Sequence, residues 1–229
     1  MSNGKQLPTY MKVSSQTNMI NVNNDKFVTM DAGEKYKVDP NEDEHEVLPN
    51  KLGLTTKADV EKEEAKGFID ANVDLTLGLD ATVKFDEAYI MAIHEKALQH
   101  LYKFAGKLRT VNLSKGGFMF PAAQFLPNGM QDFQTEILSN LKDEYSNKEE
   151  LIEAIAKVHG ELLYIHPFRE GNGRTARMLA NLMSYKAGYE RLKFEKLDSE
   201  EMFNKYIKAV QKVGLKQYQP MVEIITFVF

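Results

Sequence analysis

Apolar positions are sparse in the first 50 residues and become periodic beyond them. The N-terminal part is rich in Asn, Asp, Lys and Thr, with short alternating pieces at Phe27–Met30 and Tyr36–Val38. Alternation of this kind is typical of extended chain. We therefore expect residues 1–50 to be a loosely structured extended segment, with at most a small pair of strands. The acidic run Asn41–Glu46 at its end indicates a solvated face.

Helical periodicity begins after Thr55 and Thr56, either of which suits the cap of a first helix. Leu75–Asp80 resembles a turn, and Gly106 and Gly188 are expected to end helices. The predicted helices are Lys57–Ala71, Phe85–Phe104, Phe133–Tyr145, Lys148–Ile165, Gly173–Lys186, Asp198–Val213 and Tyr218–Phe229.

One segment changes character between these helices. Arg109–Leu113 alternates, Ser114–Gly117 has turn composition, and Phe118–Phe120 can return as a second strand, which predicts a short hairpin. Pro121 and Pro127 bracket the residues that follow it. We therefore predict an all-α fold with one small β-hairpin, without internal repeats.

Composition narrows the functional classes. Of 229 residues, 43% are hydrophobic and 27% are charged, as in ordinary globular proteins. A net charge of −4 argues against a bulk nucleic-acid binder, and the absence of cysteine excludes disulfides and thiolate metal sites. No window resembles a signal peptide or a membrane-spanning helix. We expect a soluble cytoplasmic protein that binds neither nucleic acid nor membrane.

The densest chemistry lies in residues 166–177, HPFREGNGRTAR. Pro167 disfavours helical geometry at His166, so His166 should end the preceding helix and face a loop. Its imidazole is the side chain of this loop that can accept a proton near neutral pH. The candidate general base is therefore His166.

The remaining residues of the stretch favour phosphate. Gly171 and Gly173 allow close backbone approach, and the next helix starts there with its amides and positive dipole end. Arg174 and Arg177 lie one turn apart beside those amides, and two cations at a helix N-terminus suggest a compensating anion. Glu170 supplies the kind of carboxylate oxygen that Mg²⁺ prefers.

The alternatives explain less of this stretch. Glu170, Arg174 and Arg177 could be a surface ion-pair cluster beside a glycine turn, but that leaves the combination with a base unexplained. A hydrolytic metal centre is disfavoured because His159 and His166 are two helical turns apart and no HExxH occurs. No Walker loop and no supported Ser or Cys nucleophile is present.

The stretch resembles the motif HPFx[D/E]GNGRxxR of the Fic family at every fixed position. Three flanking segments, Asn50–Thr55, Phe104–Gly116 and Tyr206–Val210, are also similar to Fic domains. The resemblance implies a helical Fic domain over residues 51–229, with a hairpin flap over the active loop. It further implies transfer of AMP from ATP to a Tyr, Ser or Thr hydroxyl of a target protein, releasing pyrophosphate.

The resemblance also implies a role for each motif residue. His166 would deprotonate the target hydroxyl, and Glu170 would hold Mg²⁺ between the α- and β-phosphates. The α- and β-phosphates would occupy an anion hole, and Arg174 and Arg177 would contact the β-phosphate side and the γ-phosphate. Phe168 would point into the core and fix the loop. The residues implied for the anion hole are Gly171, Asn172 and Gly173.

The hairpin and its surroundings suggest partners. Lys115, Gly116 and Gly117 lie at the hairpin tip, and an exposed hairpin edge could pair with an extended target segment. No Ser or Thr has the spacing [S/T]xxxE[G/N] of the internal inhibitory helix found in many Fic proteins; Ser146 with Glu150 is nearest, but Leu151 follows. The resemblance therefore implies a separate small antitoxin whose glutamate reaches Arg177.

Two other functions stay open. A Fic protein can transfer another phosphate-containing group, such as UMP, phosphocholine or phosphate, although the intact GNGR favours AMP. A nucleotide-binding interaction module that has lost transfer is the other alternative, and the intact His166 and Glu170 argue against it.

Overall fold

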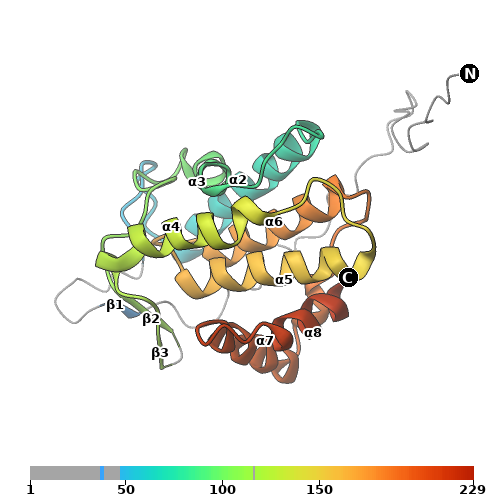
Figure 1. The fold of residues 1–229 in the computed structure, drawn as a ribbon. Coiled ribbons are helices and arrows are strands. Elements are labelled where there is room, and N and C mark those ends of the chain that lie inside the picture. The colour runs from blue at the N-terminus through green and yellow to red at the C-terminus, as the bar shows by residue number, and fades with distance from the viewer. Residues whose placement is uncertain (1–36, 39–46, 116) are drawn as a thin grey trace, which may run out of the picture.

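The computed structural model describes residues 37–38, 47–115 and 117–229 (Figure 1). The described chain is mainly helical, as predicted. Its helices are α2 (Lys57–Leu77), α3 (Glu87–Leu98), α4 (Leu126–Glu136), α5 (Lys148–Ile165), α6 (Asn172–Lys186), α7 (Glu200–Val213) and α8 (Gln219–Val228). Short 3₁₀ turns lie at Ala123–Phe125, Leu138–Asn140 and Phe194–Leu197.

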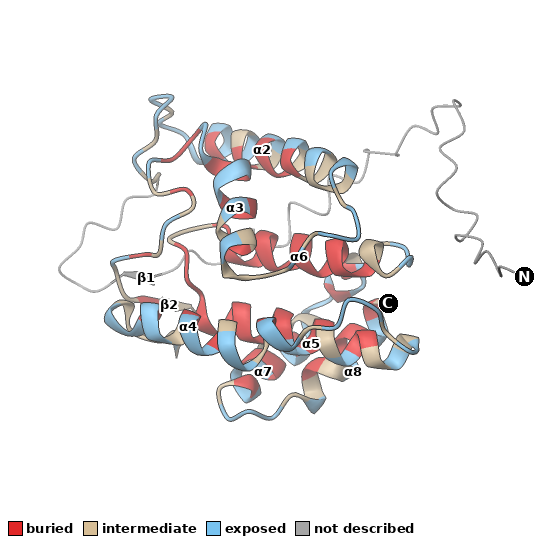
Figure 2. Cartoon of the chain, turned by 45° about the horizontal axis from the view of Figure 1, so that its top comes forward, coloured by how far each residue is buried: buried red, intermediate tan, exposed pale blue. Residues whose placement is uncertain are grey.

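Helices α5 and α6 pack against each other at the centre of the molecule (Figure 1). Helices α2 and α3 cover α6 on one side, and α7 and α8 cover α5 on the other. Both central helices are buried over most of their length, as the red ribbon of Figure 2 shows. The loop between α5 and α6, residues 166–171, therefore lies at the end of a buried pair of helices.

The bounds of α5 agree with its sequence. Asn147 caps its N-terminus, accepting a hydrogen bond from the amide of Glu150 at 2.9 Å, and the helix ends before Pro167 as the ring of a proline requires. The predicted bounds of four C-terminal helices are confirmed to within two residues: α5, α6, α7 and α8.

Helix α3 is shorter than predicted. It ends at Leu98 rather than Phe104 because the chain turns at Gln99. Lys51 binds two backbone carbonyls of this turn. The Lys51 amine donates to the carbonyl of Gln99 at 2.5 Å, and its backbone amide donates to that of Leu101 at 2.8 Å. These caps come from a distant segment, so local periodicity does not indicate them. Gly106, with φ +70°, makes a later turn.

Two other boundaries were predicted wrongly. Helix α2 continues through Leu77, so the expected turn at Leu75–Asp80 begins only at Gly78. The helix predicted at Phe133–Tyr145 is α4, which starts at Leu126 and contains Pro127 in its first turn. A proline fits there because first-turn amides have no intrahelical acceptor.

The predicted hairpin is present as β2 (Leu113–Lys115) and β3 (Phe118–Met119). Its first strand was predicted too early, at Arg109–Leu113, and β2 takes up part of the expected turn Ser114–Gly117. A third strand, β1 (Lys37–Val38), pairs antiparallel with the other edge of β2, with Lys37 opposite Ser114. Of the piece expected at Tyr36–Val38, residues 37–38 thus pair with the hairpin. Tyr36 and the piece Phe27–Met30 lie outside the described residues. The acidic run Asn41–Glu46 lies outside the described residues.

Gly67 marks the closest approach of α2 to α3. A Cβ on Gly67 would lie 2.0 Å from the backbone oxygen of Ala97, whereas a Cβ on Gly129 in α4 would meet nothing within 4 Å. We expect Gly67→Ala to lower the free energy of unfolding by about 2 kcal/mol, because neither backbone can move without repacking. The matched Gly129→Ala should raise it by roughly 0.5 kcal/mol. Urea unfolding of both variants measures this, and equal effects would contradict the packing described.

Candidate active site

His166 ends α5 in the left-handed conformation, with φ 53° and ψ 57°. Its Nδ1 lies 3.0 Å from the carbonyl oxygen of Leu163. A carbonyl can only accept, so Nδ1 carries the proton and Nε2 holds the lone pair. The ring stacks on Phe120 from the flap, with centroids 3.9 Å apart. The imidazole is thus fixed in the tautomer that a general base acting through Nε2 requires.

Two reciprocal hydrogen bonds close the loop after His166. The Phe168 amide donates to Oδ1 of Asn172 at 2.8 Å, and Nδ2 of Asn172 donates to the Phe168 carbonyl at 2.7 Å. Both residues are fully buried. The Phe168 side chain points into the core, the position predicted for it. The side chain of Asn172 shapes the loop, so its backbone amide is the group left to contact a ligand.

His94 of α3 packs against this loop. Its ring stacks on Phe168 at 3.8 Å between centroids. Nδ1 accepts from the Gly106 amide at 2.9 Å, so Nε2 carries the proton and donates to the carbonyl of Glu170 at 2.9 Å. Burial lowers the pKa of His94 to about 4, which keeps the ring neutral. A neutral histidine with two fixed partners is a structural support.

Gly171 places the N-terminus of α6 against the loop. Its φ is +78°, and a Cβ there would lie 3.1 Å from Leu98 and 3.2 Å from Phe68. It is the N-cap residue of α6 and provides no side-chain acceptor for the first amides. The positive end of α6 therefore points into the loop, where it can attract an anion.

Glu170 is the acidic residue of this loop. Its Oε1 accepts from the Gly171 amide at 2.8 Å and lies 3.4 Å from Nη2 of Arg174. The side chain is 22% exposed, so the carboxylate is accessible from solvent. Among the described residues no cluster of three or more His, Asp or Glu could hold a metal. One carboxylate fits Mg²⁺ that is otherwise bound by phosphate oxygens and water, the usual arrangement for this ion.

Arg174 is buried and held by α2. Its Nη2 donates to Oε2 of Glu64 at 2.7 Å, and its guanidinium lies 4.8 Å above the ring of Phe68. Tyr102 donates to the other oxygen of Glu64 at 2.5 Å, and burial with the Glu64 charge raises the pKa of Tyr102. The arginine is thus oriented before any ligand binds.

Arg177 lies one turn further along α6 and is 3% exposed. The adjacent His159 donates from Nδ1 to the carbonyl of Ala176 at 3.1 Å and accepts from the Tyr206 hydroxyl at 2.6 Å. Burial, assisted by the Arg177 charge, lowers the pKa of His159 to about 3. His159 is therefore a neutral core residue.

The structure places the motif residues in the loop after α5 and at the start of α6, whereas the residues predicted at the hairpin tip lie at the end of β2 and after it. Lys115 is half-buried, Gly117 is exposed with φ +77°, and Gly116 lies outside the described residues. Residues that sequence reasoning missed support the site from other elements: Glu64, His94, Tyr102 and Arg109. Of these four, Glu64 is the one that the sequence could have indicated, because its spacing from Phe68 places both on one face of a helix.

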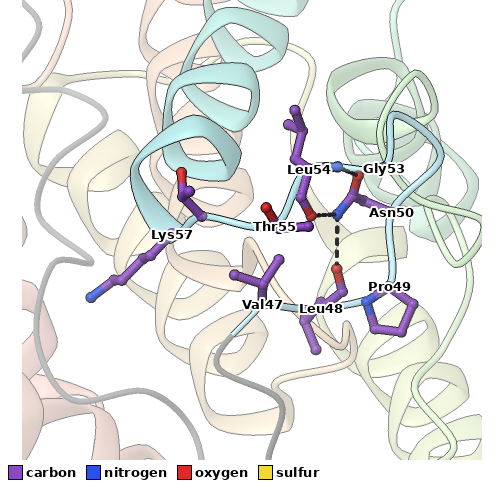
Figure 3. Close-up of a pocket in the computed structure, with 9 residues that line it drawn as sticks. Val47, Leu48, Pro49, Asn50, Gly53, Leu54, Thr55 and Lys57 are labelled. Atoms are coloured by element: carbon purple, nitrogen blue, oxygen red, sulfur yellow. Dashed lines mark hydrogen bonds between the residues drawn. The ribbon is translucent and has the colours of Figure 1, made fainter.

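A separate pocket is lined by residues 47–50 and 53–57 (Figure 3). Asn50 organises it, donating to the carbonyls of Leu48 and Leu54 and accepting from the Leu54 amide at 2.8 Å. Lys57 is the sole ionisable residue of its lining. The pocket shares no residue with the motif, and we assign it no catalytic role.

The fold and the site define a helical domain whose catalytic candidates lie on the loop between two buried helices, and comparison with known proteins shows which family this domain resembles. Residues 84–184 match the Fic/DOC family. The chain therefore carries a Fic domain within these residues.

Two relatives illustrate the match. Protein adenylyltransferase Fic of Nematostella vectensis is 32% identical over 147 residues, covering 62% of this chain and 33% of the relative. Protein adenylyltransferase VbhT of Bartonella schoenbuchensis is 30% identical over 169 residues, covering 71% of this chain and 34% of the relative. The chain thus spans about a third of the length of these relatives.

Solved structures share the fold. The N-terminal Fic domain of a Bartonella quintana Bep effector protein has a TM-score of 0.66 and 22% identity, covering 82% of this chain and 90% of that one. The same domain with bound ADP also has a TM-score of 0.66. Within the described residues no helix is both long and apolar enough to cross a membrane.

The buried pair of Glu64 and Arg174 can be tested by stability. Removing the Glu64 carboxylate leaves a cation at 4% side-chain exposure without its main partner, so Glu64→Ala should cost about 3 kcal/mol of unfolding free energy. Glu61, 53% exposed beside Lys57 on the same helix, is the matched control, and Glu61→Ala should cost about 0.5 kcal/mol or less. Urea unfolding measures both. A small loss in Glu64→Ala would mean that α2 does not hold Arg174.

Proposed function

We propose that this chain transfers AMP from ATP to a hydroxyl of a target protein and releases pyrophosphate. The observation that carries the proposal is one rigid loop that holds a base, a carboxylate and a helix N-terminus with two buried arginines. Relatives named protein adenylyltransferase and a solved Fic domain with bound ADP support it. We further propose that the Fic domain spans residues 51–229, because α2 packs on both α3 and α6.

The chemistry follows from the loop. Nε2 of His166 accepts the proton of the target hydroxyl as its oxygen attacks the α-phosphorus. The new bond joins that oxygen to phosphorus, and the bond from phosphorus to the bridging oxygen of the β-phosphate breaks. Arg174, Arg177 and the amides of residues 171–173 attract the negative charge of the phosphates. The leaving group is pyrophosphate.

We propose Mg²⁺ as the metal, with Glu170 as its protein ligand. The partly exposed carboxylate beside the Gly171 amide and Arg174 supports this assignment. When bound, the ion would neutralise phosphate charge. Glu170 is itself positioned by the Gly171 amide and by the contact of its carbonyl with His94.

The target is proposed to dock as an extended segment along the flap. The sequence left open which edge of the hairpin would pair with the target. In the described part of the chain β1 pairs with β2, so the edge left for a target is that of β3. Met119 on β3 is exposed, and the next residue, Phe120, stacks on His166. A strand added to β3 would therefore lie near the base. Contact of the target with Lys115, Gly116 and Gly117 stays part of this proposal.

Regulation by a separate antitoxin also stays a proposal. A small helical protein whose glutamate reaches Arg177 would block the γ-phosphate site. The described chain pairs Glu64 with Arg174, the first arginine of the motif, rather than with Arg177. Cytoplasmic action is compatible with a chain that has no cysteines. Transfer of UMP, phosphocholine or phosphate, and simple nucleotide binding, are the alternative functions.

Labelled ATP tests the reaction. With Mg²⁺ and a target-containing lysate, ATP labelled at the α-phosphate should label protein, and ATP labelled at the γ-phosphate should not. His166→Ala should lower the rate by about a hundredfold or more, the usual contribution of a general base. His100→Ala, which removes a partly exposed histidine beside Glu63, is the matched control and should keep the wild-type rate.

Other results would redirect the proposal. Transfer of γ-label would mean a kinase, and label transfer that persists in His166→Ala would remove the base from the mechanism. The chain could instead bind ATP in a Mg²⁺-dependent way that a chelator reverses, yet transfer neither label. That result would favour another donor or the interaction module.

A further inference from the structure

Arg109 joins the flap to the catalytic loop through one buried guanidinium. Nε donates to the carbonyl of His166 at 2.8 Å, Nη1 to that of Val111 at 2.6 Å, and Nη2 to that of Pro121 at 2.6 Å. Val111 precedes β2 and Pro121 follows β3. A single side chain therefore ties both arms of the hairpin to the residue that carries the base.

The backbone of Arg109 adds a fourth contact. Its amide donates to the carbonyl of Pro167 at 2.8 Å, so two consecutive carbonyls after α5 are bound by one residue. His166 is not a glycine, and its left-handed backbone costs of order 1–3 kcal/mol. These two hydrogen bonds hold the peptide groups that this conformation turns out of the helix.

The charge of Arg109 has an unusual environment. The residue is 4% exposed, and the contacts of its side chain within the described chain are with main-chain carbonyls. Burial and the nearby Arg169 lower the pKa of Arg109 to about 10, which leaves it charged at neutral pH. A lysine would keep the charge but could not reach three divergent acceptors with a planar fork.

These contacts converge on the imidazole of His166. The hydrogen bond from its Nδ1 to the Leu163 carbonyl depends on the position of the His166 backbone. The orientation of its ring depends on stacking against Phe120. Arg109 fixes the carbonyl of His166 on one side and that of Pro121, next to Phe120, on the other. Among the described residues, its hydrogen bonds go to main-chain carbonyls outside the set proposed to hold phosphate.

We propose that Arg109 is a positioning residue that sets His166 against the flap, so that a hydroxyl presented by the flap meets Nε2. The inference rests on the proposed transfer reaction. It predicts that Arg109 affects the alignment of base and target but not the affinity for nucleotide.

Arg109→Lys tests this with two independent readouts. The transfer rate should fall about a hundredfold, the order expected from a displacement near 1 Å, while ADP binds with wild-type affinity in calorimetry. Long-range ¹H–¹⁵N NMR, with the His166 signals assigned by their loss in His166→Asn, should show the Nδ1–H tautomer in wild type and a mixture in Arg109→Lys. Arg191→Lys, which alters a surface arginine paired with Glu195, should match wild type in all three measurements.

Each result of this experiment either supports or contradicts the positioning role of Arg109. A folded Arg109→Lys protein with wild-type transfer and a wild-type His166 spectrum would overturn the inference, as would loss of ADP binding in parallel with transfer. If wild type itself transfers nothing, the proposed reaction fails, and the His166 spectrum still decides whether Arg109 positions the base.

A second variant covers the case in which Arg109→Lys does not fold. Phe120→Leu removes the aromatic face that the flap presents to His166. It should lower transfer and alter the His166 spectrum while ADP affinity is retained. Wild-type values for both readouts in Phe120→Leu would contradict the coupling of flap and base.

Discussion

The reciprocal hydrogen bonds between the Asn172 side chain and the Phe168 backbone are the constraint on which the site depends. They close the turn between two buried helices whose ends would otherwise leave polar backbone groups without partners. Within that turn Gly171 adopts the left-handed conformation, and the Glu170 side chain is partly exposed. The positive end of α6 then faces the same space as the base, and the chemistry follows from this geometry.

Charge in the site is buried before a ligand arrives, and each cation is stabilised differently. Arg174 is paired with Glu64 and covered by Phe68, whereas Arg109 is bound by three carbonyl dipoles. The neutral His94 adds shape without charge. Such preorganisation means that phosphate binding does not have to order long side chains, which lowers its entropic cost. The supports come from α2, α3 and the flap, so the site belongs to the whole domain.

The sequence predicts the fold and the site correctly where the signals are local. Helix α5 was predicted to the residue because Asn147 and Pro167 lie next to its ends, and the motif residues converge because one loop carries them. It was insufficient where the cause is distant. Lys51 ends α3 from a segment before α2, and strand β1 pairs with a hairpin more than 70 residues away. Glu64 sits in an acidic stretch that looks solvated, and only the fold turns it toward Arg174.

In the proposed reaction, the loop after α5 binds the phosphates of ATP with the α-phosphate facing His166. A crystal structure with a non-hydrolysable ATP analogue and Mg²⁺ tests it most directly. We predict the phosphates at the N-terminus of α6, in contact with Arg174 and Arg177, with the metal at Glu170 and the α-phosphate on the side of Nε2. A nucleotide bound elsewhere, or one whose phosphates avoid α6, would contradict the account.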